Sequence, residues 1–279
     1  MIIRCYGARG GIAVSGEDYL KYGGDTTCLE IRSANDEIII IDAGSGIRRL
    51  GNRLLQEQRN HFNIIFTHSH WDHILGFPFF KPIYHEKTLI HLRGCPVTQG
   101  SLKKLLSKAM TPPYFPVQFD KLKATIEYTG ACETRFHIDS VEILPINLSH
   151  PNGGLGYKFT ENGKTFVFLT DNELGYRHRG GAAFDEYVEF ANDADLLIHD
   201  AEYVPEQYTA TRTWGHSTYV DALRLALRAR AKRLGLFHHN QDRNDADLDN
   251  IVRTCRQTIK DERRDMECFA LTQDMQLTL

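Results

Sequence analysis

The sequence predicts a mixed α/β (α+β) fold in which strands alternate with glycine turns and a few helices. Three observations support this prediction: short apolar runs of strand length, longer stretches with apolar residues at helical spacing, and a similar order of elements in the two halves of the chain. The 279 residues are 42% hydrophobic and 25% charged, an ordinary globular composition with ample apolar residues for a core. No linker or low-complexity stretch divides the sequence, so we expect a single domain over residues 1–279.

The first half is expected to be mostly strands. Runs of apolar and β-branched residues predict strands at 1–6, 26–32, 37–42, 63–67 and 88–93. Apolar residues at helical spacing predict helices at 46–58 and 99–110. The segment 7–27 carries six glycines, and it is expected either to lie near a functional site or only to turn tightly.

The second half contains the clearest helix signal. Residues 217–231 place Val220, Leu223 and Leu227 on one face, and Ser217 or Thr218 can cap the first turn. Further helices are expected at 184–191 and 245–260. Strands are expected at 124–128, 140–146, 155–160, 165–169, 195–199 and 234–238.

A short internal similarity links the two halves. The segment 38–44, which ends Asp-Ala-Gly, resembles the segment 196–202, which ends Asp-Ala-Glu. In each half a helix and another strand follow, and these later strands end at His68 and His238. Two similar halves that face each other would bring both histidines to one edge of the fold.

The most informative segment is Thr67–His73, which follows an apolar run. It holds His68, His70, Asp72 and His73. Side chains at i and i+2 of an extended chain point the same way, so His68 and His70 can reach one metal ion. Asp72 and His73 follow where the chain turns and can reach a second ion. Imidazole and carboxylate ligands suit zinc, and also manganese or iron. The alternative is a group of surface polar residues after a strand.

Composition and charge restrict the class of protein. The net charge of −3 argues against a basic surface along the whole chain, although the arginines of helix 217–231 leave a local patch open. Residues 1–6 are typical of a strand rather than a signal peptide, and no segment approaches the roughly 18 apolar residues of a membrane span. The six cysteines form no CxxC pair, which indicates reduced thiols and a cytoplasmic protein. The sequence leaves the oligomeric state open.

The sequence resembles the metallo-β-lactamase superfamily. The motif HxHxDH is followed by His150, Asp171 and His238, each after an apolar strand. The resemblance implies an αββα sandwich with the metal site at the edge of the two sheets. It also implies that Asp42 orients the metal ligands. The two implied sets are His68, His70 and His150 for one ion and Asp72, His73 and His238 for the other, with Asp171 bridging them. Zinc is the expected metal, and manganese or iron are the alternatives.

Two further segments resemble ribonuclease Z and its phosphodiesterase relatives. Trp214–Thr218 is similar to their GHST segment, and His199–Glu202 is similar to their HEAT segment. The resemblance implies that Asp200 steers His216, which assists the leaving group. Asp200 stands where the relatives have glutamate, and Glu202 where they have threonine. The alternative is that His216 only precedes a helix cap. The glycine-rich opening is similar to the phosphoribosyl cyclic phosphodiesterases of the same branch.

The expected function is therefore that of a binuclear metal-dependent hydrolase acting on a small or cyclic phosphodiester. A metal-bridging hydroxide would attack, Asp72 would orient it, and His216 would donate a proton to the leaving oxygen. One alternative is an RNA-processing nuclease that resembles ribonuclease Z, although the basic, glycine-rich arm with which that enzyme grips tRNA has no counterpart here. The other is a thioester or lactone hydrolase that resembles glyoxalase II. The segment 111–116 forms either a lid or a rigid surface connection, and Trp71 either lines the pocket or packs inside.

Overall fold

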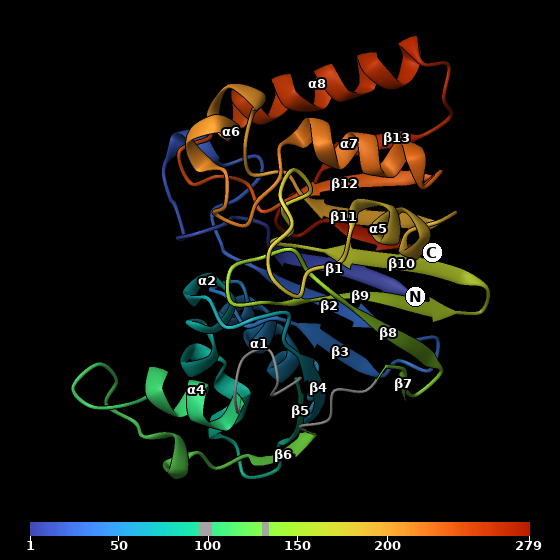
Figure 1. Ribbon diagram of the computed structural model, residues 1–279. Coiled ribbons are helices and arrows are strands. Elements are labelled where there is room, and N and C mark those ends of the chain that lie inside the picture. Colours follow the sequence, from blue (N-terminus) through green and yellow to red (C-terminus); the bar gives the residue numbers. More distant parts are fainter. Residues whose placement is uncertain (95–101, 130–133) are drawn as a thin grey trace.

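The computed structural model describes residues 1–94, 102–129 and 134–279. Two β-sheets lie face to face, with one layer of helices outside each sheet (Figure 1). The αββα arrangement that the resemblance implies is thus confirmed.

The first sheet combines an antiparallel and a parallel part. Within the described residues it has seven strands in the order β14-β1-β2-β3-β4-β5-β6. Its strands are β1 (Ile2–Gly7), β2 (Cys28–Arg32), β3 (Ile38–Ile41), β4 (His61–Ile65), β5 (Leu89–Arg93), β6 (Thr125–Thr129) and β14 (Gln276–Thr278). The strands from β14 to β3 pair antiparallel, and those from β3 to β6 pair parallel.

The second sheet repeats this construction. Its order over the described residues is β13-β12-β11-β10-β9-β8-β7. Its strands are β7 (Phe136–Ile138), β8 (Val141–Asn147), β9 (Leu155–Glu161), β10 (Lys164–Leu169), β11 (Leu196–Asp200), β12 (Arg233–Phe237) and β13 (Glu267–Ala270). The strands from β7 to β10 pair antiparallel, and those from β10 to β13 pair parallel. The similarity between segments 38–44 and 196–202 therefore reflects matching strands, since β3–β4 and β11–β12 are both parallel pairs joined through helices.

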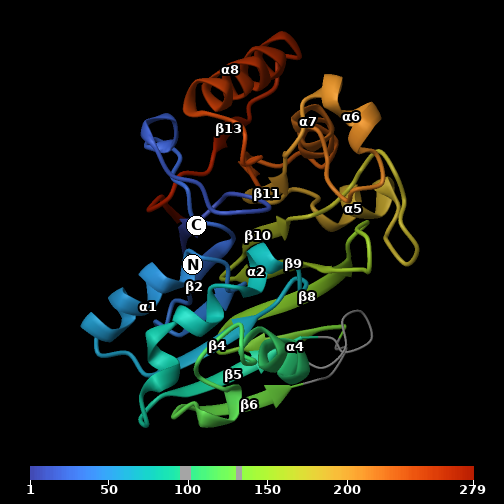
Figure 2. The ribbon, with the colours of Figure 1, turned by 90° about the vertical axis from the view of Figure 1, so that its left-hand side faces the viewer.

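The helices form the two outer layers. In both views α1 and α4 lie on the opposite side of the sheets from α7 and α8 (Figure 1, Figure 2). The helices outside the first sheet are α1 (Ile47–Gln56), α2 (Trp71–Ile74) and α4 (Leu102–Ala109). Those on the other side are α5 (Phe184–Phe190), α6 (Pro205–Thr211), α7 (Tyr219–Arg228) and α8 (Asp245–Asp261). Short 3₁₀ turns are η1 (Glu17–Tyr19), η2 (Phe77–Phe79), η3 (Lys81–Tyr84) and η4 (Phe119–Lys121).

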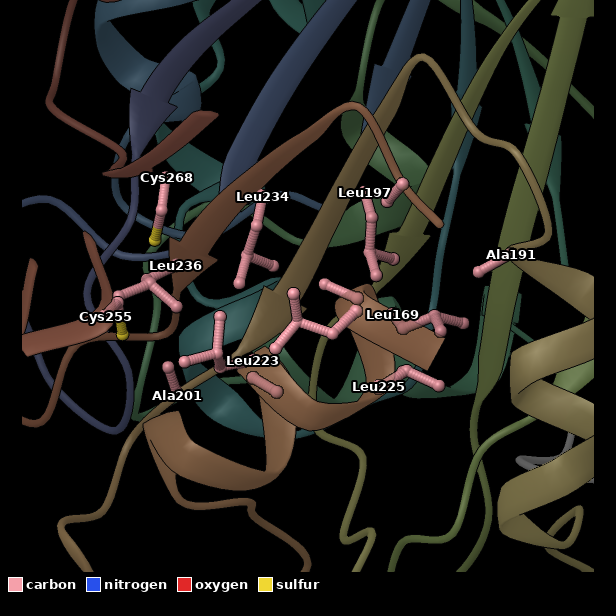
Figure 3. Close-up of a cluster of buried hydrophobic side chains, with 14 of the residues drawn as sticks. Leu169, Ala191, Leu197, Ala201, Leu223, Leu225, Leu234, Leu236, Cys255 and Cys268 are labelled. Carbon is pink, nitrogen blue, oxygen red and sulfur yellow. The ribbon is translucent and has the colours of Figure 1, made fainter. Parts of the chain in front are cut away.

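Alternate residues of the central strands serve two different cores. In β3, Ile39 and Ile41 face the second sheet, whereas Ile38 and Ile40 pack under α1. Because both faces of such a strand are buried, it is apolar along its whole length. The outer core of the second sheet joins strand residues such as Leu197 to helix residues such as Leu223 (Figure 3).

The predicted elements all occur, with differences at their ends. The predicted helix 217–231 begins at Tyr219, because the Thr218 side chain caps it by accepting a hydrogen bond from the Asp221 N–H (3.1 Å). The helix predicted at 99–110 is described from Leu102 onward, and residues 99–101 lie outside the described residues. Among the α-helices and strands of the described residues, five were not predicted and are short or carry few apolar residues: α2, α6, β7, β13 and β14.

Candidate metal centre

Four strand ends bring the predicted ligands together. The segment His68–His73 follows β4, and His150 follows β8. Asp171 follows β10, and His238 follows β12. Their side chains are buried or half-buried and form two groups that could hold a metal ion. The groups are His68, His70, His150 and Asp171, and Asp72, His73, Asp171 and His238.

Asp171 belongs to both groups. Its Oδ2 atom lies 3.3 Å from His68 Nε2 and 3.4 Å from His238 Nε2, while its Oδ1 atom lies 3.2 Å from His73 Nε2. A carboxylate in this position can contact two cations at once. The geometry therefore matches the bridging position that the resemblance implies for Asp171.

The surroundings of two buried nitrogen atoms indicate whether cations fit at this site. His68 Nε2 and His73 Nε2 are buried and make no hydrogen bond, although the Asp171 oxygens lie 3.3 and 3.2 Å away, respectively. A buried polar atom without a partner is costly unless something else satisfies it. Burial also lowers the pKa of His150 to about 3, which keeps its imidazole in the neutral, metal-binding form. The donor set thus fits divalent cations.

The other ring nitrogen of three ligands is held by an oxygen. His73 Nδ1 donates to Asp42 Oδ2 (2.8 Å), and His238 Nδ1 donates to Glu202 Oε2 (2.8 Å). His150 Nδ1 donates to the carbonyl of Gly215 (3.0 Å). Such partners fix the tautomer and the direction of the ring, so each Nε2 points toward the other ligands.

Three of the site residues have left-handed backbone. The φ angles of Asp42, Asp171 and His238 are 60°, 51° and 55°, and each residue lies at or near the end of a buried strand. Non-glycine residues rarely adopt this conformation, and such strain tends to collect at functional sites. At these three positions the left-handed backbone turns the side chain away from the strand direction and into the ligand cluster.

Asp200 and His216 also meet. His216 Nδ1 donates to Asp200 Oδ2 at 2.7 Å, and Glu202 Oε2 lies 3.4 Å from the same nitrogen. Burial alone would lower the pKa of His216, but Glu202 and Asp200 raise it to about 9. The His216 ring stacks on His238, with centroids 4.7 Å apart. The predicted pair is therefore next to the cluster.

Gly10 and Gly11 of the glycine-rich segment 7–27 lie at the site, which is one of the two alternatives left open by the sequence. The Gly11 N–H donates to Asp72 Oδ2 (2.9 Å). A Cβ atom on Gly10 would stand 2.2 Å from the His238 ring, so no larger residue fits there. The glycine at position 10 therefore allows the loop to cover His238.

Two carboxylates at the site were not predicted from the sequence. Glu202 holds His238, and its spacing of two from Asp200 on an extended chain was a usable signal. Glu173 is buried and accepts hydrogen bonds from the loop that carries His216. Its four donors are His178 Nε2, Tyr208 Oη and the N–H groups of Thr213 and Gly215. Nothing in the local sequence indicates these contacts, because they depend on how two loops meet.

The cluster opens into a cavity of about 590 Å³, which we call the polar cavity. His216 lines it together with Asp72 and Asp171. Trp71 and Trp214 lie on its wall and are largely exposed, so Trp71 is a pocket residue rather than a packed one. The remaining lining residues are Gly11, His70, Glu202, Tyr203, Gln207, Ala210, Thr211, His238, Asn240, Gln241 and Asp242.

Two other expectations can be compared with the structure. His239 is buried with Nε2 2.9 Å from the Leu271 carbonyl and lies outside both ligand groups, in line with the preference for His238. In the segment 111–116, Tyr114 points into solvent and Phe115 packs edge-on against Phe79 at 5.6 Å. No described helix is long and apolar enough to cross a membrane.

Comparison with known proteins agrees with the geometry. Residues 37–239 match the model of the β-lactamase superfamily domain. A ribonuclease Z from Thermococcus gammatolerans is 28% identical over 246 residues, which cover 72% of this chain and 74% of that protein. The chain therefore belongs to the β-lactamase superfamily, in its ribonuclease Z-like branch, and is a metal-dependent hydrolase.

Solved structures share the fold over the whole chain. The metallo-β-lactamase fold protein YhfI from Bacillus subtilis superposes with a TM-score of 0.72 and 18% identity, covering 99% of this chain and 98% of that one. A diphosphatase from the PhnP family gives a TM-score of 0.70 and 16% identity, covering 100% of this chain and 97% of that one. At these identities the structures support the fold alone.

Proposed function

We propose that this protein hydrolyses a small phosphodiester at two divalent cations. The observation that carries the proposal is that Asp171 faces both ligand groups while His216 opens onto the same cavity. The proposed ligands are His68, His70 and His150 for one cation, Asp72, His73 and His238 for the other, and Asp171 for both.

Cations held there would lower the pKa of a coordinated water and offset charge on the phosphoryl oxygens. The residues of the chain then have separate tasks. Asp72, fixed by the Gly11 N–H, orients the attacking water. Asp42 and Glu202 keep His73 and His238 directed at the centre.

His216 donates a proton to the leaving oxygen. Its Nδ1 is occupied by Asp200, so Nε2 is the nitrogen that can serve the substrate. Asp200 fixes the tautomer and balances the charge of the protonated ring. The position of His216 on the cavity wall places this donor beside the space for the substrate.

The charges around the cavity favour a small diester over a long polyanion. None of the described residues that line the polar cavity is a lysine or an arginine. Two arginines at the end of α7 are already paired with carboxylates: Arg228 with Asp185 at 3.0 Å and Arg230 with Asp193 at 2.8 Å. Phosphate contacts along a nucleic acid usually require several free cations.

A second candidate is an RNA-processing nuclease, which the similarity to the Thermococcus ribonuclease Z favours. Both candidates cleave a phosphodiester and would use the same residues. The two candidates differ in the substrate, which is a small diester in the first and a long RNA in the second.

The experiment compares turnover of bis(p-nitrophenyl) phosphate and a 2′,3′-cyclic nucleotide with cleavage of a precursor tRNA. Turnover of the small diesters without salt-sensitive tRNA binding supports the first candidate. Efficient tRNA cleavage with poor turnover of small diesters supports the nuclease. Turnover of a thioester or lactone and of no phosphodiester contradicts both.

A further inference from the structure

A second cavity adjoins the polar cavity. It has a volume of about 310 Å³, and we call it the apolar cavity. Gly11, Trp71 and Asp72 line both cavities, so both spaces border Asp72, one of the proposed ligands. Its other lining residues are Ile12, Ala13, Thr26, Ser45, Arg48, Leu75, Gly76 and Phe79.

The apolar cavity gathers exposed hydrophobic side chains. Ile12, Leu75 and Phe79 are 65%, 45% and 55% exposed, and Trp71 is 74% exposed. These four are among the ten large hydrophobic side chains that are exposed within the described residues. Apolar side chains scattered singly over a surface need no explanation, but a group around one hollow marks a binding site.

The two cavities differ in the groups they offer. The polar cavity contains His216, the proposed proton donor, and the amide side chains of Gln207, Asn240 and Gln241. The apolar cavity contains neither His216 nor any of the histidines proposed as ligands. The ester oxygen that leaves has to lie near the proton donor. The substituent on that oxygen, which we call the leaving arm, therefore belongs in the polar cavity. The other substituent, the retained arm, stays bonded to phosphorus and has to extend from the metal centre into a different space.

The geometry points to the apolar cavity as the subsite for the retained arm of the diester, with a preference for a flat hydrophobic group such as an aryl ring. This inference rests on the proposed function and specifies its substrate class. A cavity of this volume lies at the lower end of ligand pockets and suits one ring rather than a long chain. Trp71 stands between the two arms and contacts both spaces.

The test uses two substrates with the same leaving group, phenyl p-nitrophenyl phosphate and methyl p-nitrophenyl phosphate. The quantity measured is the ratio of their kcat/KM values in the metal-loaded protein. Comparing this ratio between variants cancels the difference in intrinsic reactivity. Leu75→Trp fills the cavity and should lower the phenyl-to-methyl ratio roughly tenfold, because burial of an aromatic ring contributes at least that factor.

Phe79→Ser provides a second variant that does not depend on how the tryptophan packs. It removes an apolar wall and should lower the ratio in the same direction. Leu20→Trp is the matched control, because Leu20 is 79% exposed and lines neither cavity. This control should keep the ratio of the original protein.

The possible outcomes separate a failure of the proposed function from a failure of the subsite. If the unmodified, metal-loaded protein turns over neither substrate, the proposed function is wrong and this inference is wrong with it. Turnover of both, with a ratio that neither Leu75→Trp nor Phe79→Ser changes, keeps the proposed function and overturns the subsite. If the ratio is unchanged but light scattering shows that Leu75→Trp alters the molecular mass, the apolar cavity is a contact between copies and the subsite is again overturned.

Discussion

His216 Nδ1 lies 2.7 Å from Asp200 Oδ2, although the HEAT segment that residues 199–202 resemble has the longer glutamate at this position. The contact is possible because Asp200 is the last residue of β11 and is fully buried beside the loop that carries His216. Glu202, which takes the place of the threonine in that segment, supplies a second carboxylate 3.4 Å from the same nitrogen and also holds His238. Two carboxylates thus position two histidines.

His216→Ala should reduce turnover without removing metal. Because a positioned proton donor contributes about 10²–10⁴-fold, kcat should fall by that range for a substrate with an alkoxide leaving group. The loss should be smaller for p-nitrophenyl esters, whose leaving group needs little protonation. Turnover with both leaving groups and metal content are the measurements, with the exposed His85→Ala as control. Undiminished turnover of the alkyl ester would exclude His216 as the donor.

Glu202→Gln should weaken metal binding. The carboxylate accepts from His238 Nδ1, and loss of such a partner typically costs about 10–100-fold in metal affinity. Competition with a chelator of known affinity measures this change. Glu206→Gln, four residues on and exposed, is the matched control. Equal affinity in the two variants would mean that Glu202 does not orient His238.

Glu173→Gln should destabilise the loop that carries His216. The amide would place an NH₂ group against donors that now meet a carboxylate, such as the N–H groups of Thr213 and Gly215. A buried donor left without an acceptor costs about 1–3 kcal/mol, so the free energy of unfolding should fall by that amount. Urea unfolding checks the value, with the exposed Glu189→Gln as control. A change within error of the control would show that the contacts are not needed.

Asp195 should make stability depend on pH. Burial alone would raise the pKa of Asp195, but hydrogen bonds from Lys232 and the Thr165 N–H hold it below its usual value. A lowered folded pKa adds stability above the unfolded pKa of about 3.9, and this contribution is lost as the pH falls through the folded value. Asp195→Asn should therefore cost on the order of 1 kcal/mol at pH 7, and this difference should shrink as the pH falls from about 4 toward the folded pKa. A constant difference from pH 7 to pH 3 would contradict this assignment.

Elements whose pattern of apolar residues is regular along their whole length could be predicted from the sequence. The strand Ile38–Ile41 is apolar throughout because both of its faces are buried, and α7 shows both a cap and an apolar face. Weakly patterned elements such as β13 and β14 were missed, since their pairing with β12 and β1 is what stabilises them.

The proposed ligands could be singled out in the sequence because they are typical metal-binding residues that follow apolar runs or stand together in the segment His68–His73. The groups around them were harder to predict. The residue type alone does not predict the left-handed backbone at Asp42 and Asp171. Aspartate adopts this conformation more readily than most other residues but seldom does so. The contacts of Glu173 and the apolar cavity arise from loops far apart in the chain, which local patterns do not bring together.

We propose above all that the clustered histidines and aspartates hold the cations at which a phosphodiester is hydrolysed. The most direct measurement is the metal content of the purified protein together with turnover of bis(p-nitrophenyl) phosphate, with His68→Ala alongside. We expect two equivalents of divalent metal and turnover in the original protein, and loss of turnover with reduced metal in His68→Ala. No bound metal after reconstitution with zinc, manganese or iron, or equal turnover in His68→Ala, would contradict the account.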